Sequence, residues 1–118
     1  MAGEIAFIEI GVGDTDRGRA FYEGLFGWSF EPGPSSGWTF ETPTVPGGMH
    51  GGDPGVSPYV FFAVDDIDAA IEQVKSLGGS VEEMDVEGDE ESTRQFGRFK
   101  LCRDDQGSTF GLHQRPER

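Results

Sequence analysis

The sequence predicts an α+β fold made of two tandem βαβββ modules that form a cupped mixed sheet. Three observations lead to this class: a repeat at a spacing of 52 positions, short strand-like runs, and two amphipathic helix-like runs that each end at glycine. At 118 residues the chain is long enough for one domain with one core. We expect a single domain over residues 1–118, with one module at about 4–52 and the other at about 57–115.

The repeat aligns residues 8–28 with residues 60–80. Matching pairs are Val12 with Val64, Asp14 with Asp66, Asp16 with Asp68, Leu25 with Leu77, and Gly27 with Gly79. In each copy an apolar run leads to aspartates, then to a helix-like run, then to glycine. A duplicated unit in so short a chain indicates two half-cups that face each other, and we expect a ligand-binding cleft between them.

The first module begins with residues 6–12, which alternate well enough for a strand. A side-chain oxygen of Asp14, Thr15 or Asp16 can cap a helix that stops at Gly27. Pairs at i,i+4 spacing predict a broad apolar face on this helix, made of Phe21, Tyr22, Leu25 and Phe26. Three more strands are expected at residues 28–31, 38–42 and 45–50, and the glycine-rich residues 47–55 are interpreted as a mobile loop at the cleft rim.

The second module begins with a strand at residues 59–64, after which Asp65 or Asp66 can cap a helix that stops at Gly78. The apolar residues of this helix follow the i, i+3, i+4, i+7 rule: Ile67, Ala70, Ile71, Val74 and Leu77. Strands are expected at residues 81–86, 95–103 and 108–114. A solvated acidic loop is expected where Asp85, Glu87, Asp89, Glu90 and Glu91 crowd together, because their spacing does not match a calcium loop.

The charge balance restricts the partners. With 9 basic and 22 acidic residues, the net charge is −13, which repels nucleic acid and anionic lipid and leaves neutral or cationic small molecules as ligands. No apolar run approaches the ~20 residues that span a bilayer. The single cysteine, Cys102, is expected to be a half-buried structural thiol. It fits a reducing cytoplasm, and the first residues lack the features of a signal peptide, so we expect a cytoplasmic protein.

Several segments, in this order, resemble one known family. They are Asp14 and residues 19–22, 25–28, 64–69, 77–79 and 110–112. Together they resemble the vicinal oxygen chelate superfamily, which includes glyoxalase I, bleomycin-resistance proteins and extradiol dioxygenases. The resemblance implies a small-molecule ligand and a homodimer. It is more specific for the fold than for an activity, because function depends on the site.

The resemblance also places the metal ligands of the metal-dependent members at Phe7, Gly48, Tyr59 and Gly111. None of these residues is a usual ligand, since metal binding needs imidazole, carboxylate or thiolate groups. The standard metal centre is therefore expected to be missing, and no cofactor is expected.

An alternative metal site lies two steps along the same strands, where side chains face the same side. Those positions hold Glu9, His50, Phe61 and His113. Two histidines and a carboxylate form a facial triad, so Glu9, His50 and His113 are the alternative ligands of a divalent metal ion. The other interpretation makes Glu9 a hydrogen-bonded pocket residue and lets each histidine fill ordinary space. A carboxylate in a partly buried strand needs a partner, which makes Glu9 the first candidate for a functional or catalytic residue.

Two functional hypotheses follow. The first is a metal-free protein of the glyoxalase/bleomycin-resistance type that sequesters an aromatic or cationic ligand. The alternative is an enzyme of the same superfamily, a lyase, isomerase or oxygenase, with Glu9 as general base or the shifted triad holding a metal. A purely structural or protein-binding module is a third class. Trp38 and Phe40 share a strand face, either as core or as cleft wall. The candidate ligand-binding residues are Phe7, Glu9, Trp38, Phe40, His50, Tyr59, Phe61 and His113.

Overall fold

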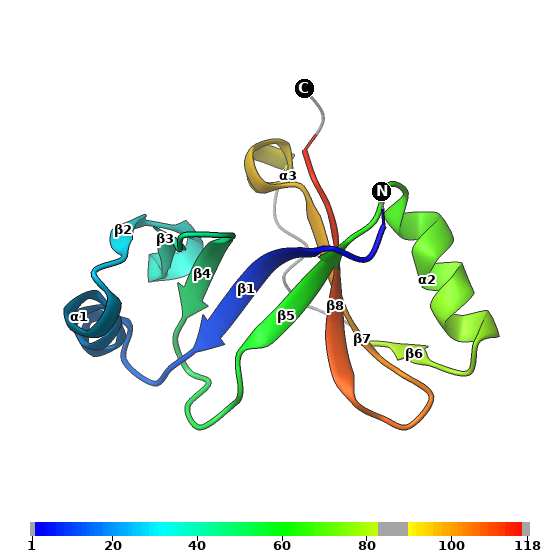
Figure 1. The fold of residues 1–118 in the computed structure, drawn as a ribbon, viewed down its shortest axis with the longest axis horizontal. Helices are drawn as coiled ribbons and strands as arrows, with labels where there is room; N and C mark the ends of the chain where they lie inside the picture. The colour runs from blue at the N-terminus through cyan, green and yellow to red at the C-terminus, as the bar shows by residue number, and fades with distance from the viewer. Residues whose placement is uncertain (1, 83–89, 117–118) are drawn as a thin grey trace. The chain divides into compact units, whose positions relative to one another are not determined.

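The computed structural model describes residues 2–82 and 90–116, which fall into two compact units (Figure 1). The first unit is residues 7–59, and the second is residues 60–118 together with residues 1–6. Strands and helices follow the βαβββ order twice, with one additional helix in the second unit, so the predicted α+β class is confirmed. No helix in the described part of the chain is long and apolar enough to cross a membrane.

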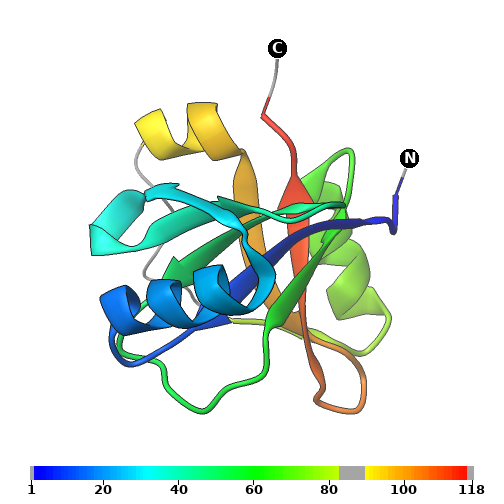
Figure 2. The same ribbon diagram turned by 60° about the vertical axis from the view of Figure 1, so that its left-hand side comes forward.

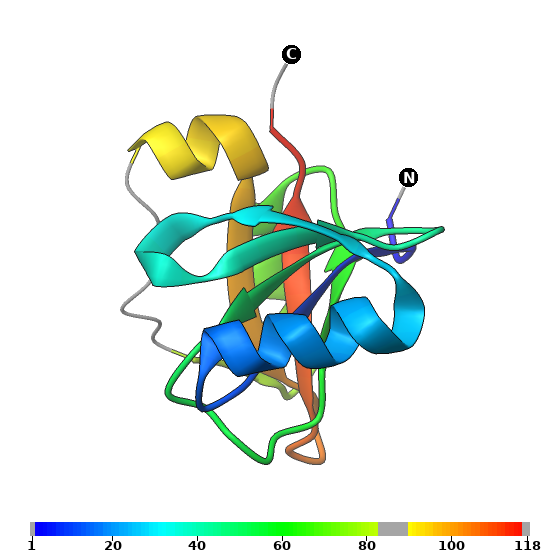
Figure 3. The same ribbon diagram turned by 90° about the vertical axis from the view of Figure 1, so that its left-hand side faces the viewer.

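The strands of the first unit lie in the order β2-β3-β4-β1. β1 runs parallel to β4, and the other neighbours are antiparallel. The elements are β1 (Ile5–Gly11), α1 (Thr15–Phe26), β2 (Ser29–Pro32), the 3-10 turn η1 (Pro34–Ser36), β3 (Trp38–Glu41) and β4 (Pro46–His50). Helix α1 lies across one face of these strands (Figures 2 and 3). Each strand agrees with the sequence-based expectation to within one residue at either end.

Helix α1 begins and ends where the sequence indicates. The Asp14 carboxylate accepts hydrogen bonds from the backbone N–H groups of Asp16 (2.9 Å) and Arg17 (3.1 Å), which have no partner within the helix. At the other end Gly27 adopts the left-handed conformation with φ of 72°, and its N–H donates to the Glu23 carbonyl. The same cap recurs in the second unit, where the Asp66 carboxylate accepts from the Ala69 N–H at 3.1 Å.

The predicted apolar face of α1 is only partly used. Phe21, Leu25 and Phe26 are each more than half exposed, and only Tyr22 of the four is half-buried. The helix packs against the sheet through Gly18, where an added Cβ would lie 2.9 Å from the Met49 sulfur. This close approach is possible only without a side chain at position 18, and it sets which side of the helix meets the strands. Most of the broad apolar face expected from the sequence is therefore exposed rather than packed against the strands.

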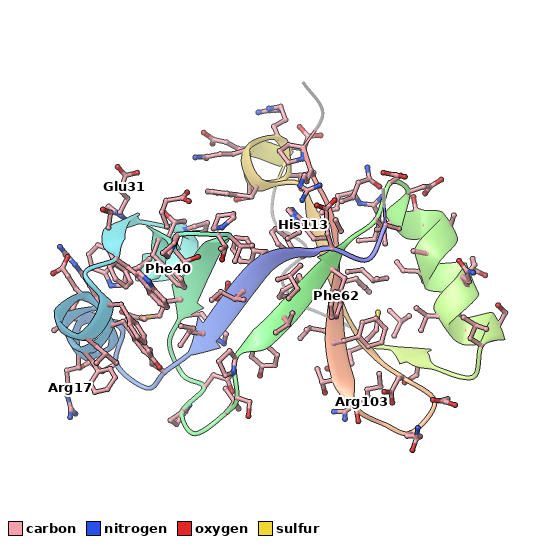
Figure 4. The ribbon with its side chains drawn as sticks, in the orientation of Figure 1. Arg17, Glu31, Phe40, Phe62, Arg103 and His113 are labelled. Carbon is pink, nitrogen blue, oxygen red and sulfur yellow. The ribbon has the colours of Figure 1, made fainter. Side chains whose placement is uncertain are left out.

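The core of the first unit is built on Ile10, Phe40 and Met49. Trp28 stacks on Phe40 with ring centroids 4.8 Å apart (Figure 4 labels Phe40). Trp38 lies on the same strand face as Phe40; its indole N–H donates to the Thr15 carbonyl at 3.1 Å, on the side of the helix. Trp38 and Phe40 are thus core residues rather than the wall of a cleft. Both residues lie on the face of the sheet opposite Glu9, together with Ile10 and Met49, so the structure does not bring them to the candidate site.

The strands of the second unit lie in the order β5-β8-β7-β6, with β5 parallel to β8. The elements are β5 (Tyr59–Ala63), α2 (Ile67–Ser76), β6 (Ser80–Val81), α3 (Glu90–Phe96), β7 (Arg98–Arg103) and β8 (Thr109–Gln114). Its core consists of Ile67, Cys102 and Leu112, with the apolar side chains of α2 packed against them. Cys102 is fully buried, and burial raises the pKa of its thiol, as suits a structural cysteine.

The segment before β7 differs from the sequence-based expectation. The predicted strand at residues 95–103 begins only at Arg98, because residues 90–96 form α3 and Gly97 reverses the chain with φ of 88°. Glu90 and Glu91, expected in a loop, open this helix, where carboxylates favour the N-terminal end of the dipole. The other acidic residues of the predicted loop, Asp85, Glu87 and Asp89, lie outside the described residues, as do positions 83–86 of the predicted strand.

Candidate functional site

Glu9 and His50 come from neighbouring strands of the first unit and lie on the same face. In the parallel pairing of β1 and β4, Glu9 is opposite Gly48, and Gly11 is opposite His50. Side chains alternate along each strand, so Ile10 and Met49 point to the other face, into the core. The alternation therefore separates a polar face, which carries the site, from the apolar face that packs under α1.

A continuous chain of hydrogen bonds joins four side chains on this polar face. His50 Nδ1 lies 2.6 Å from Glu9 Oε2, and His50 Nε2 lies 2.8 Å from Asp53 Oδ2. The Tyr59 hydroxyl donates to the same Asp53 oxygen at 2.9 Å. We call these four residues, Glu9, His50, Asp53 and Tyr59, the Glu9–Tyr59 network. All four belong to the first unit, so one compact unit builds the whole network.

The two carboxylates hold His50 in its charged form. They raise the pKa of His50 to about 9, chiefly through the hydrogen bond to Glu9 and despite partial burial, which acts in the opposite direction. The reciprocal hydrogen bond from His50, with a second from Tyr59, lowers the pKa of Asp53. At neutral pH the ring is an imidazolium that donates one N–H to each carboxylate. Two anions around one cation leave the network with a net charge of −1.

Glu9 and Asp53 reach His50 across two glycines that leave room for them. A Cβ at position 48 would lie 2.5 Å from Glu9 Oε1, and a Cβ at position 11 would lie 2.6 Å from Asp53 Oδ2. Distances this short exclude any side chain at these positions without movement of the carboxylates. The second oxygen of Glu9, Oε1, accepts no hydrogen bond within the described part of the chain. The network therefore presents one open acceptor, above the bare backbone of Gly48.

Phe7 borders the same open acceptor. The tip of its ring, Cζ, lies 3.3 Å from the point where a Cβ of residue 48 would stand. An aromatic ring and a carboxylate oxygen thus meet over Gly48. The carboxylate oxygen suits a group that donates hydrogen bonds and carries positive charge, and the ring offers an apolar contact beside it.

Phe61 and His113, the other two candidate residues, lie in the second unit. His113 is 5% exposed and stacks on Phe99 at 4.2 Å, while Phe61 meets Phe99 edge-on at 5.3 Å. Burial lowers the pKa of His113, so the ring is neutral, and its Nε2–H donates to the Phe96 carbonyl at 2.8 Å. Figure 4 labels His113 on its strand. The two residues form an aromatic cluster with Phe99 that is mostly buried.

Asp53 is the member of the network that the sequence interpretation missed. It stands in a run of glycine and proline, residues 51–55, within the segment that the sequence predicts only as a mobile loop. In the structure the segment is bonded to the strand, since the Asp53 N–H donates to the Val12 carbonyl at 3.0 Å. The sequence did offer one signal: Asp53 follows the candidate histidine His50 by three residues. A carboxylate at that spacing can reach the histidine if the turn folds back.

The chain has recognisable relatives, although no family model matches it. It is 30% identical to the anthracycline biosynthesis protein DnrV of Streptomyces peucetius over 135 aligned positions, which cover 93% of this chain and 46% of DnrV. It is 29% identical to CFP32 of Mycobacterium tuberculosis, provisionally named a glyoxylase, across 92% of this chain and 44% of CFP32. The chain therefore spans about half the length of the curated relatives that it matches.

Solved structures share the fold over almost the whole chain. A hypothetical protein of Bacillus halodurans superimposes with a TM-score of 0.71 at 16% identity, covering 98% of this chain and 96% of the other. Methylmalonyl-CoA epimerase of Streptomyces coelicolor, in complex with 2-nitronate-propionyl-CoA, gives 0.68 at 15% identity, covering 99% and 100%. The fold and the glyoxylase-named relative agree with the segments that predicted the family. These relatives and this fold are consistent with the vicinal oxygen chelate superfamily, which the sequence resembles.

The resemblance to the vicinal oxygen chelate superfamily draws attention to two glycines, one on the last strand of each module. Gly48 and Gly111 stand where the resemblance places metal ligands, and neither has a side chain to offer. In each unit the residue two steps along the first strand covers the glycine: Glu9 covers Gly48, and the Phe61 ring would overlap any Cβ at Gly111. The residues at the superfamily's metal positions therefore do not fit a metal ion.

The alternative triad of Glu9, His50 and His113 gains no support from the structure. Among residues 2–82 and 90–116, no group of three or more His, Cys, Asp or Glu side chains has an arrangement suited to a metal ion. Both ring nitrogens of His50 face carboxylates and carry protons at neutral pH. A protonated ring nitrogen has no lone pair for a metal.

Proposed function

We propose that this protein is a metal-free small-molecule-binding member of the vicinal oxygen chelate superfamily. Its site is the Glu9–Tyr59 network, and it binds an organic cation by contact with Glu9. The observation that carries the proposal is the open Glu9 Oε1 beside the Phe7 ring. An ammonium or guanidinium group would donate to this oxygen and lie against the ring. The charge-assisted hydrogen bond strengthens when the apolar ring excludes water from it.

Charge supports a cation over an anion. The network carries a net charge of −1, and the chain as a whole carries −13. An anionic ligand would meet repulsion at the site and over the approach to it, whereas a cation would be attracted at long range. The names of the relatives support a small organic ligand: one is named for anthracycline biosynthesis, and a structural neighbour is bound to a CoA derivative.

Three aromatic probes of similar size but different charge test the proposal: benzylammonium, benzyl alcohol and benzoate. Titration calorimetry at pH 7 and low salt should detect benzylammonium alone, and Glu9→Gln should weaken its binding by about tenfold or more, since a charge-assisted hydrogen bond is lost. Glu31→Gln is the matched control, because Glu31 is exposed on β2 and projects away from the unit (Figure 4). Equal binding of benzoate, or equal affinity of wild type and Glu9→Gln, would contradict the proposal.

An enzyme in which Glu9 moves a proton is the second candidate. The observation in its favour is the same open carboxylate oxygen, since a general base must reach its proton directly. The structural neighbours named methylmalonyl-CoA epimerase suggest the first substrate to try. Incubation of methylmalonyl-CoA with the protein in D₂O, followed by proton NMR, reports exchange at the carbon next to the carbonyl. Exchange lost in Glu9→Gln supports the enzyme, and no exchange above background excludes this reaction.

The homodimer and the cytoplasmic location expected from the sequence stay predictions. Light scattering after size exclusion would distinguish a dimer from a single chain of 12.8 kDa.

A further inference from the structure

Asp53 is the branch point of the Glu9–Tyr59 network. One of its oxygens, Oδ2, accepts two hydrogen bonds, from His50 Nε2 at 2.8 Å and from the Tyr59 hydroxyl at 2.9 Å. Tyr59 stands at the start of β5, while His50 ends β4. The charged carboxylate thus ties the two ends of the connection between β4 and β5 to each other.

Backbone hydrogen bonds to the residue after β1 fix the position of Asp53. The Val12 N–H donates to the His50 carbonyl at 2.9 Å, and the Asp53 N–H donates to the Val12 carbonyl at 3.0 Å. The connection therefore turns back onto the end of β1 and packs on Gly11, where an added Cβ would meet the Asp53 backbone oxygen at 2.8 Å and a Val56 methyl at 2.9 Å. The position of Asp53 is set by the strand, and the turn carries its carboxylate to His50.

His50 needs two partners to hold a single orientation. A histidine with one partner can turn its ring by half a revolution about χ2, which exchanges the atoms that face that partner. In this site the two ring nitrogens each face a carboxylate, Glu9 on one side and Asp53 on the other. The ring therefore donates one N–H to Glu9 Oε2 and leaves Oε1, which lies beside Gly48, without a hydrogen bond from the described residues.

We propose that Asp53 and Tyr59 are positioning residues of the binding site: they fix the orientation and charge of His50, and through it the Glu9 carboxylate that meets the ligand. The role of these residues in ligand binding rests on the proposed function, whereas their effect on His50 does not depend on any ligand. Neither Asp53 nor Tyr59 needs to touch the bound cation. Their effect reaches Glu9 through the imidazolium ring.

Titration of His50 by NMR tests the geometry without any ligand. Two-bond proton–nitrogen spectra show whether both ring nitrogens carry protons, and they follow the titration of each histidine separately. The groups that face His50 are Glu9 from β1, Asp53 from the connection and Tyr59 from β5. In wild type both His50 nitrogens should stay protonated from pH 6 to pH 8, consistent with its pKa of about 9. Asp53→Asn should lower the titration midpoint by about one unit or more, since a neighbouring opposite charge is removed.

Tyr59→Phe should lower the titration midpoint of His50 less than Asp53→Asn does. The charge of Asp53 stays, and Asp53 loses only the hydrogen bond from Tyr59. Gly11→Ala should act in the same direction as Asp53→Asn, because it displaces Asp53 without changing its chemistry. Asp68→Asn is the matched control: its carboxylate pairs with Arg98 in the second unit, and its loss should leave the His50 titration unchanged. An unchanged His50 midpoint in both Asp53→Asn and Tyr59→Phe would overturn the proposal.

Benzylammonium binding then separates this inference from the proposed function. If Asp53→Asn weakens binding several-fold while His50 loses its fixed double protonation, both are supported. If wild type binds no benzylammonium but the His50 titration shifts as expected, the positioning role stands and the proposed ligand class is wrong. Binding that is lost in Asp53→Asn with an unchanged His50 titration would overturn the positioning role, because Asp53 would then act directly on the ligand.

Discussion

Glu9 and Phe61 occupy equivalent positions in the two modules, and each covers a glycine of the strand beside it. Glu9 lies over Gly48 in the first unit, and Phe61 lies over Gly111 in the second. The repeat of 52 positions relates Glu9 to Phe61, and each of the two glycines lies on the last strand of its module. In both modules a side chain from the first strand covers a glycine of the neighbouring strand. The side chain is a carboxylate in the first module and a buried aromatic ring in the second. The polar version carries the proposed binding site.

Alanine at the two glycines should have different effects. Gly111→Ala should destabilise the protein by about 2 kcal/mol or more, because the Phe61 ring is 4% exposed and cannot move aside cheaply. Gly48→Ala should cost less stability, because the end of the Glu9 side chain can shift, but it should abolish benzylammonium binding. Gly24→Ala in α1, with no atom within 4 Å of its added Cβ, should stabilise by about 0.5–1 kcal/mol. Urea unfolding measures all three, and equal losses at positions 48 and 111 would contradict the difference in chemistry.

His50 should stabilise the folded protein at neutral pH and lose this effect in alkali. Its folded-state pKa of about 9 is above the value of 6.5 expected in the unfolded chain, so the stabilisation is complete below pH 6.5 and disappears as the pH rises through 9. The side chain is 39% exposed, so solvent screening reduces the effect to on the order of 1–2 kcal/mol.

The difference in unfolding free energy between wild type and His50→Gln at pH 7 and pH 10 measures this effect. The difference should shrink at the higher pH. At the acidic end, the lowered pKa of Asp53 keeps its pair with His50 intact until the pH falls below the usual carboxyl value of 3.8. Lys75→Gln, which removes an exposed ion pair with Glu72, should show little change at either pH. A His50→Gln difference that grows with pH would contradict the charged ring.

His113 should show the opposite dependence. Burial lowers its pKa, so the unfolded chain takes up a proton near pH 6.5 that the folded protein excludes. The stability contributed by His113 is therefore present above pH 6.5 and falls as the pH is lowered. The advantage of wild type over His113→Phe, which keeps a ring against Phe99, should shrink from pH 7 to pH 5. Guanidinium unfolding at the two pH values measures this, and a constant difference would be inconsistent with a buried neutral histidine.

Metal content separates the binding hypothesis from the shifted triad. Protein purified without a histidine tag, then dialysed with zinc or iron(II) and passed through a desalting column, should retain no stoichiometric metal. Both His50 nitrogens carry protons that a metal would have to displace. Elemental analysis gives the content, with His50→Ala and His113→Ala as comparisons. One equivalent of metal in wild type that is lost in both variants would establish the Glu9–His50–His113 site instead.

The parts of the fold that local chemistry determines could be predicted from the sequence. Asp14 and Gly27 mark the ends of α1 because a cap and a left-handed residue act within a few positions. The outward direction of Leu25 could not be predicted, because it depends on how closely Gly18 approaches Met49 in the folded unit. The helix at residues 90–96 was missed for a related reason: acidic residues suit both a loop and the first turn of a helix.

Part of the candidate site could be predicted from the sequence. Glu9 and His50 followed from counting two steps along neighbouring strands, which alternation guarantees. Asp53 reaches them through a turn whose path depends on backbone bonds to Val12, and no periodicity reports such a path. For Trp38 and Phe40 the sequence left core and cleft wall open, because aromatic residues suit both equally well, and only the packing shows that they lie in the core.

The location of the bound cation is the most direct test of the proposed site. Proton–nitrogen NMR spectra of the backbone, recorded while benzylammonium is added, identify the residues nearest to it. We expect the largest shifts at the amides of Glu9, Gly48 and His50, with no comparable change in Glu9→Gln. Shifts that centre on the exposed apolar side chains of α1, at Phe21 and Leu25, would show nonspecific hydrophobic binding and would contradict a site built on Glu9.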